Sequence, residues 1–81
     1  MASHYRGGTI QLRRCDSDKN VARFYSLDVE RDLFGKVVLV RRWGRIGTAG
    51  KVRLDEYPEE GRAVAAMEAL RRRKIQRGYR F

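Results

Sequence analysis

The sequence is poor in the residues that form covalent cross-links and metal sites. It contains one cysteine, Cys15, and one histidine, His4, among 81 residues. A lone cysteine cannot form a disulfide within the chain, which is typical of a protein from a reducing compartment. One cysteine and one histidine are also too few for a closed zinc site of the usual kind. We therefore expect no internal disulfide, no bound metal and no cofactor.

Long apolar runs are missing as well. No stretch approaches the roughly 20 apolar residues that span a bilayer, and the N-terminal sequence MASHYRGG lacks the apolar centre of a signal peptide. These features predict a soluble intracellular protein with no membrane partner, in the cytoplasm and, for a bacterial source, associated with the nucleoid. A domain this short buries about 60% of its unfolded surface, which leaves little room for a deep enzyme cleft.

Residues arranged for catalysis are also lacking. Cys15 has no histidine to activate it other than His4 in the N-terminal segment. The carboxylates fall at outward positions and in turns, where we expect solvated or arginine-paired charges: Asp28, Glu30, Asp32, Asp55, Glu56, Glu59 and Glu60. Because no nucleophile stands beside a base, the sequence predicts a non-catalytic protein with no small-molecule substrate.

Positive charge, in contrast, is abundant. The chain has 19 lysines and arginines against 10 acidic residues, a net charge of +9. Such an excess favours a polyanionic partner, either nucleic acid or an anionic membrane surface. A basic domain with no such partner is the alternative that charge alone leaves open.

Hydrophobic periodicity predicts four strands. Apolar and polar residues alternate over 9–14 and 24–30, with the apolar ones facing inward. A third strand is expected over 36–43, and a fourth, short one around Val52 and Leu54. The third strand contains four consecutive apolar residues from Val37 to Val40, which is typical of a central strand covered from both sides.

A helix is expected to close the chain. Pro58 suits a first helical turn, and apolar residues then recur at helical spacing at Val64, Met67 and Leu70 before the natural stop at Gly78. The fold class is therefore α+β, a small antiparallel sheet of about four strands with one C-terminal helix packed on it. We expect residues 9–81 to form this single domain and residues 1–8 to be a flexible N-terminal arm.

The stretch VRRWGRIGTAG, from Val40 to Gly50, holds the only tryptophan. Its glycines suggest a phosphate-binding loop, but five residues separate Gly44 from Gly50 where a P-loop has four. Val52 also stands where a P-loop has the Ser or Thr that binds magnesium. The glycines are better explained by positive φ angles and by the close approach of another backbone.

Basic residues crowd around Trp43 at one end of the expected sheet: Arg41, Arg42, Arg45, Lys51 and Arg53. Arginines can bond phosphate oxygens with two parallel hydrogen bonds, and an aromatic ring can stack on a base or sugar. The combination is typical of a nucleic-acid surface, although these residues alone do not say which nucleic acid. The alternative for Trp43 is a core position without a ligand. The second basic run, Arg71 to Lys74, is better explained as a solvated helix end.

The same stretch resembles the signature of the WGR domain family, named for its Trp-Gly-Arg core. The resemblance rests on Arg42 to Thr48, on the basic-aromatic run Arg23 to Leu27, and on the closing helix before Gly78-Tyr79. It covers roughly residues 9–80. Short standalone proteins of this family, which look bacterial, are also similar in the turn Leu33 to Gly35.

The resemblance implies a function in DNA repair. The family is best known as a module of poly(ADP-ribose) polymerases that binds DNA at strand breaks, where the tryptophan packs on the sugar of the terminal nucleotide. Carried over, Trp43 is the end-stacking residue and Arg45 a phosphate or interdomain contact. The polymerases commonly have an asparagine where this chain has Ala22, and nothing here corresponds to their catalytic domain. The DNA-binding residues expected on these grounds are Trp43, Gly44, Arg45, Arg42, Arg41, Lys51 and Arg23.

The leading hypothesis is thus a non-catalytic module that binds duplex DNA, with a preference for ends or nicks, beside a protein partner in DNA processing. One alternative is a protein-interaction module in which Trp43 and Arg45 recognise an acidic partner, since Trp and Arg are enriched at interface hot spots. Another is a binder of single-stranded nucleic acid or RNA.

Overall fold

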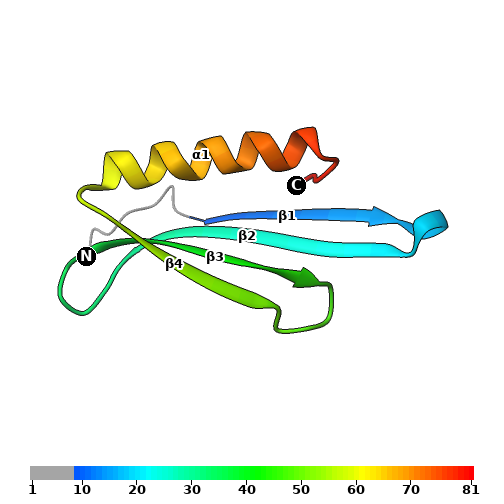
Figure 1. Cartoon of the computed structure of the whole chain (residues 1–81), viewed down its shortest axis with the longest axis horizontal. Helices are drawn as coiled ribbons and strands as arrows, with labels where there is room; N and C mark the ends of the chain where they lie inside the picture. The colour runs from blue at the N-terminus through cyan, green and yellow to red at the C-terminus, as the bar shows by residue number, and fades with distance from the viewer. Residues whose placement is uncertain (1–8) are drawn as a thin grey trace.

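A computed structural model describes residues 9–81, so the arm expected over residues 1–8 lies outside the described residues. The described chain forms one four-stranded sheet and one long helix (Figure 1). The α+β prediction is confirmed. The elements are β1 (Thr9–Asp16), β2 (Val21–Arg31), β3 (Val37–Arg45), β4 (Lys51–Tyr57) and α1 (Glu60–Gln76), with a 3₁₀ turn (Ser17–Lys19) between β1 and β2.

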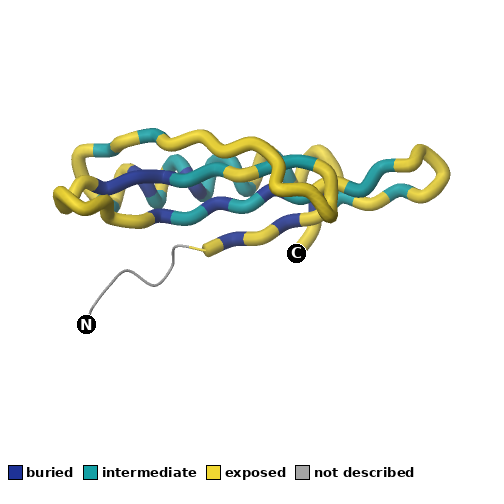
Figure 2. Tube along the Cα trace, turned by 90° about the horizontal axis from the view of Figure 1, so that it is seen from below, coloured by how far each residue is buried: buried dark blue, intermediate teal, exposed yellow. Residues whose placement is uncertain are grey.

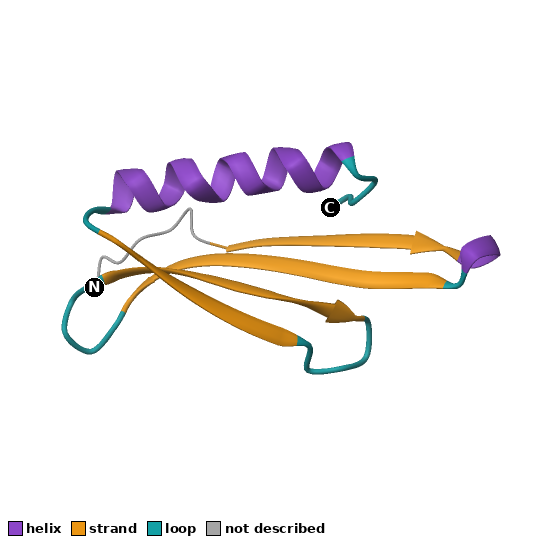
Figure 3. Ribbon diagram, in the orientation of Figure 1, coloured by secondary structure: helices purple, strands orange, loops and turns teal. Residues whose placement is uncertain are grey.

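The sheet is an antiparallel meander in which each strand pairs with the next along the chain. The helix runs along one face of this sheet, and the β1–β2 turn projects beyond the end of the helix (Figure 3). The domain is therefore elongated, with principal extents of 45 × 23 × 21 Å. We call the sheet side that carries α1 the helix face and the opposite side the outer face.

The core lies between the helix and the sheet. Leu12, Leu27, Leu39 and Met67 are each less than 2% exposed, and Ala63 lets the helix approach the strands closely. Burying one such large apolar side chain stabilises the fold by roughly 1.5–3 kcal/mol. Buried positions alternate along the strands beneath the helix (Figure 2), which is the period-two pattern that the sequence predicts for 9–14 and 24–30.

One prediction about the core holds only in part. The run Val37 to Val40 was expected to be covered on both faces, and Val37 and Leu39 do belong to the core under the helix. Val38 and Val40 face the outer side, where the described chain places no second layer; Val38 is nevertheless buried there and Val40 is half-buried. Val52 and Leu54 of β4 also lie on the outer face and are 51% and 63% exposed. A single helix covers only one face of a four-stranded sheet, whatever the apolar content of the central strand.

The β3–β4 loop folds back onto the end of β3 through two glycines. A Cβ atom on Gly44 would lie 2.8 Å from the Cα of Gly50, and one on Gly50 would collide with the carbonyl oxygen of Trp43. The ring of Phe24, whose residue pairs with Gly44 across the strands, lies over both glycines. Aromatic cover of a cross-strand glycine compensates for its missing side chain. The glycine of the Trp-Gly-Arg sequence is therefore required by close backbone packing.

We expect Gly50→Ala to lower the free energy of unfolding by about 2 kcal/mol or more, because overpacking costs about 1–3 kcal/mol and a left-handed φ about 1–2 kcal/mol. Gly50 has φ +75° and tight neighbours, whereas Gly47 has φ +95° and nothing within 4 Å of an added Cβ. Gly47→Ala is therefore the matched control, which carries the backbone cost alone. Equal losses for both variants in urea unfolding would show that the glycine contact contributes nothing.

Candidate nucleic-acid interface

Trp43 lies on the helix face, near the end of β3. It pairs with Tyr25 of β2 and Lys51 of β4, and its ring packs against the core while remaining partly exposed. The Tyr25 and Trp43 ring centroids are 6.3 Å apart with the planes tilted by 35°. Trp43 is thus neither a fully buried core residue nor a free surface ring. One side of it is anchored and the other is accessible.

Strand alternation brings cations to the same face as this ring. Arg41 and Arg45 stand two positions either side of Trp43, Arg23 pairs with Arg45, and Arg53 pairs with Arg41. The helix adds further basic residues where it ends, around cavities of about 230 and 170 Å³. We call this surface the tryptophan face; its residues are Arg23, Tyr25, Arg41, Trp43, Arg45, Lys51, Arg53, Lys74 and Arg77.

Lys74 of α1 carries its ammonium group over the aromatic rings. Its Nζ lies 4.4 Å from the centroid of the Tyr25 ring and 5.3 Å from that of Tyr79, distances at which a cation is attracted by the ring faces. Burial lowers the pKa of Lys74 below its ordinary value of 10.5, and repulsion from the guanidinium groups of Arg77, Arg41 and Arg23 lowers it further. The ammonium group is held where positive charge already accumulates.

Sequence reasoning missed Lys74 and Arg77 as site residues. Arg71 to Lys74 was assigned as a whole to a solvated helix end, but Lys74 lines the cavity beside Trp43. The spacing of Val64, Met67 and Leu70 continues to position 74, so the signal was present in the helical stripe. What the stripe could not reveal is that the helix ends above Tyr25.

Arg41 is a half-buried cation of the tryptophan face. Its Nη2 lies 3.2 Å from Oδ2 of Asp55, and its Nε is buried without a hydrogen-bond partner. Arg53 shares the same carboxylate, with its Nε 3.1 Å from Oδ1 of Asp55. One carboxylate between two arginines leaves an excess of positive charge, and it orients both side chains along β3 and β4.

Most of the remaining ion pairs lie away from Trp43. The described carboxylate pairs outside Asp55 are Arg31–Glu60, Lys36–Glu56, Arg62–Glu59 and Arg71–Glu68. Within the part of the chain that the structure describes, five cations of the tryptophan face have no carboxylate within 4.0 Å: Arg23, Arg45, Lys51, Lys74 and Arg77. The net charge is therefore concentrated at one end of the domain.

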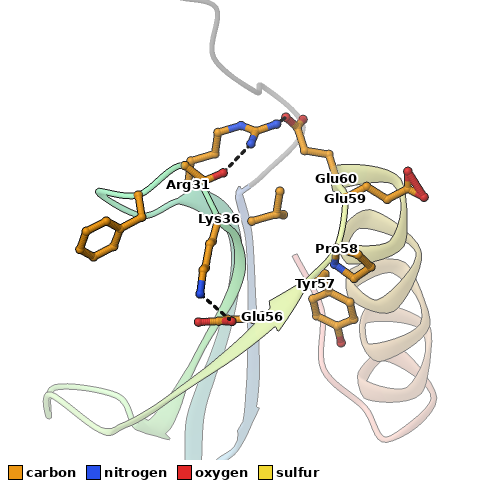
Figure 4. Close-up of a pocket in the computed structure, with 10 residues that line it drawn as sticks. Arg31, Lys36, Glu56, Tyr57, Pro58, Glu59 and Glu60 are labelled. Atoms are coloured by element: carbon orange, nitrogen blue, oxygen red, sulfur yellow. Dashed lines mark hydrogen bonds and ion pairs between the residues drawn. The ribbon is translucent and has the colours of Figure 1, made fainter.

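The opposite end shows the contrast. A cavity of about 530 Å³ lies beside the β2–β3 turn, and its cations are already paired. Arg31 donates to Glu60 at 2.6 Å and to the carbonyl oxygen of Gly35 at 2.8 Å, while Lys36 lies 3.9 Å from Glu56 (Figure 4). This cavity offers no unneutralised cation for a polyanion, although it is larger than those near Trp43.

Arg45 contacts the β1–β2 turn. Its guanidinium donates to the main-chain oxygen and to Oδ1 of Asn20, both at 3.4 Å, and Asn20 has the left-handed φ of +54° that ends the turn. The main chain supports the same junction, since the N–H of Ile46 donates to the carbonyl oxygen of Ala22 at 2.9 Å. Arg45 therefore braces the fold and still presents an exposed guanidinium group.

Two of the expected site residues do not join this surface. Arg42 was expected beside Trp43, but it pairs with Ser26 and Val52 and faces the outer side. Neighbouring strand residues point to opposite faces, so Arg42 does not lie beside the tryptophan ring. Gly44 has no side chain to offer and serves the backbone contact with Gly50. The structure does bring together Trp43, Arg45, Arg41, Lys51 and Arg23.

In the described residues no helix is long and apolar enough to cross a membrane. An uncharacterized protein, y4dW, of Sinorhizobium fredii (strain NBRC 101917 / NGR234) is 41% identical over 71 residues, which are 88% of this chain and 35% of that protein. The chain thus spans about a third of that relative's length. No solved structure matches. The profile of the WGR domain matches residues 8–81, and the chain belongs to the WGR domain family.

Proposed function

We propose that this domain binds duplex DNA through the tryptophan face and does so without catalysis. The observation that carries the proposal is the convergence of a half-buried tryptophan with cations that have no carboxylate partner. Phosphate contacts from arginine and lysine supply most of the affinity for DNA and fix the position of the protein on it. Membership of the WGR family supports the same function.

The placement of Trp43 favours strand ends or nicks over continuous duplex. Inside a duplex each base pair is covered by its neighbours, so a flat ring finds an open base face only where a strand ends or is interrupted. The ring is anchored against Tyr25 and the core, so little side-chain freedom is lost on stacking. Cations on both sides of the ring are placed to reach the adjacent phosphates.

The first test compares a short blunt duplex with closed circular DNA at equal base-pair concentration. We expect tighter binding to the blunt duplex, and we expect Trp43→Ala to weaken it about tenfold or more, since stacking on one base is worth about 1–3 kcal/mol. Phe34→Ala is the control, because Phe34 is an aromatic residue 86% exposed at the opposite end of the sheet. Fluorescence anisotropy measures the affinity of each variant for each DNA, after circular dichroism confirms that the variants are folded.

The alternatives give different results in the same assay. Equal affinity per base pair for both DNAs would remove the end preference, and no binding at low salt would remove DNA as a ligand. Unchanged DNA binding by a folded Trp43→Ala variant, together with loss of a protein partner in a pull-down, would favour the protein-interaction module. Tighter binding of single-stranded DNA or RNA than of duplex would favour the third hypothesis.

The salt dependence tests which cations meet phosphate. The logarithm of the binding constant falls against the logarithm of salt concentration by about 0.9 for each phosphate neutralised on duplex DNA. We expect Lys51→Ala and Arg23→Ala each to reduce the slope by about 0.9. Arg62→Ala should leave it unchanged, because Arg62 faces Glu59 on the helix. Identical slopes for all three variants would contradict the assignment.

Lys74 provides a test that links binding to stability. We expect Lys74→Met to raise the free energy of unfolding at neutral pH and to weaken DNA binding, because an ammonium crowded by arginines is removed. The pKa of Lys74 is lower in the folded protein than its ordinary 10.5, so the folded protein holds this proton less tightly than the unfolded chain does. Wild-type stability therefore rises with pH in the window below 10.5. A wild-type-minus-variant difference that is independent of pH would refute this.

A further inference from the structure

The outer face carries a second hollow that the proposed function does not use. It has a volume of about 290 Å³ and lies at the same end of the sheet as Trp43, on the opposite side. Its floor is formed by outer-face residues of β1, β2 and β3, which stand in the paired rows Gln11–Ser26–Arg42 and Arg13–Phe24. The β3–β4 loop forms one wall through Ile46, Gly47 and Thr48.

The charge of this hollow is positive and unneutralised. Arg13 and Arg42 are both exposed, and in the described chain neither has a carboxylate within 4.0 Å. No carboxylate is among the residues that line the hollow. Two guanidinium groups over one small depression suit an anionic ligand, and phosphate oxygens are the anions that arginine bonds best.

The floor of the hollow is aromatic and is held in place. The ring of Phe24 rests on Gly44 and Gly50 and is only partly buried. Gln11 and Ser26 add an amide and a hydroxyl that can donate to or accept from the edge of a base. An aromatic ring on an open sheet face, with arginines to either side, is the arrangement on which unpaired bases stack. A paired base in a duplex has no free face for it.

We propose that this hollow, formed by Gln11, Arg13, Phe24, Ser26, Arg42 and Thr48, binds a nucleotide of single-stranded DNA that continues from the duplex end on the tryptophan face. The inference rests on the proposed function, which supplies that end. Trp43 and Gly44 are consecutive, so the two surfaces are separated only by the thickness of the sheet at the β3–β4 loop. Lys51 and Arg45 at this end of the sheet place positive charge near the edge that a strand would cross between the two surfaces.

The test compares one duplex in blunt form and with a short thymine overhang at either its 3′ or its 5′ end. Thymine and uridine oligonucleotides of equal length are measured alone. We expect the duplex with one of the two overhangs to bind about tenfold tighter than the blunt duplex, which is the gain expected from stacking one base. In Arg13→Ala/Arg42→Ala this gain should disappear, and the thymine oligonucleotide should bind correspondingly weaker.

The control variant removes the same charge elsewhere. Arg62→Ala/Arg72→Ala takes two arginines from exposed positions on α1 and should leave the ratio of overhang to blunt affinity unchanged.

Phe24→Leu tests the aromatic floor and should reduce the same ratio. Its folding is checked first because Phe24 packs on the glycines. Both variants are read as ratios, so a general loss of electrostatic attraction cancels.

Each outcome decides the assignment. An overhang-to-blunt ratio of one in the wild type, or equal loss of the ratio in both double variants, would overturn the outer hollow as a site. Tighter binding of uridine than of thymine oligonucleotide through the same arginines would overturn its assignment to DNA. Failure of the blunt duplex to bind, with thymine binding that still depends on Arg13 and Arg42, would refute the proposed function and support the hollow.

Discussion

The packing of one helix against one face of the sheet is the constraint on which the rest of the molecule depends. The apolar part of α1, through Ala63 and Met67, covers Leu27 and Leu39 and completes the core. Further along, the same helical stripe reaches Lys74, which lies over the ring of Tyr25. The helix therefore seals one end of the sheet and leaves the other as an aromatic and cationic surface. Core and candidate site are successive parts of a single helix–sheet contact.

The pairing of charges follows the same division. Where the sheet meets the start of the helix, each cation that lines the cavity has a carboxylate beside it, as in Arg31–Glu60 and Lys36–Glu56. Such exposed pairs contribute little stability, with a median of about 0–1 kcal/mol, but they neutralise that end. The unpaired positive charge is left around Trp43. Folding therefore concentrates the net charge of +9 on one end of the domain.

The sequence was sufficient to predict the strands and the helix. It was not sufficient to predict the features that depend on contacts between them. Alternation identified Ile10, Leu12 and Tyr25 as core residues because a strand has a strict period of two. The same period could have placed Arg42 on the face of the sheet opposite to Trp43. The prediction instead counted nearby basic residues without asking which face each one occupies. The half-buried state of Val40 and the position of Lys74 depend on how many helices cover the sheet and where the helix ends. Those are properties of tertiary packing, and no window of sequence contains them.

The Trp-Gly-Arg sequence then divides into three separate tasks at a strand end. Trp43 is anchored on the helix face, where the core fixes its ring. Gly44 lets the β3–β4 loop return against the strand, under the ring of Phe24 on the outer face. Arg45 ties β3 to the β1–β2 turn through Asn20. Because neighbouring residues alternate between faces, this short sequence organises both sides of the sheet at once. The glycine contact under Phe24 thus shapes the outer hollow, while the core fixes the tryptophan on the other side of the same strand end.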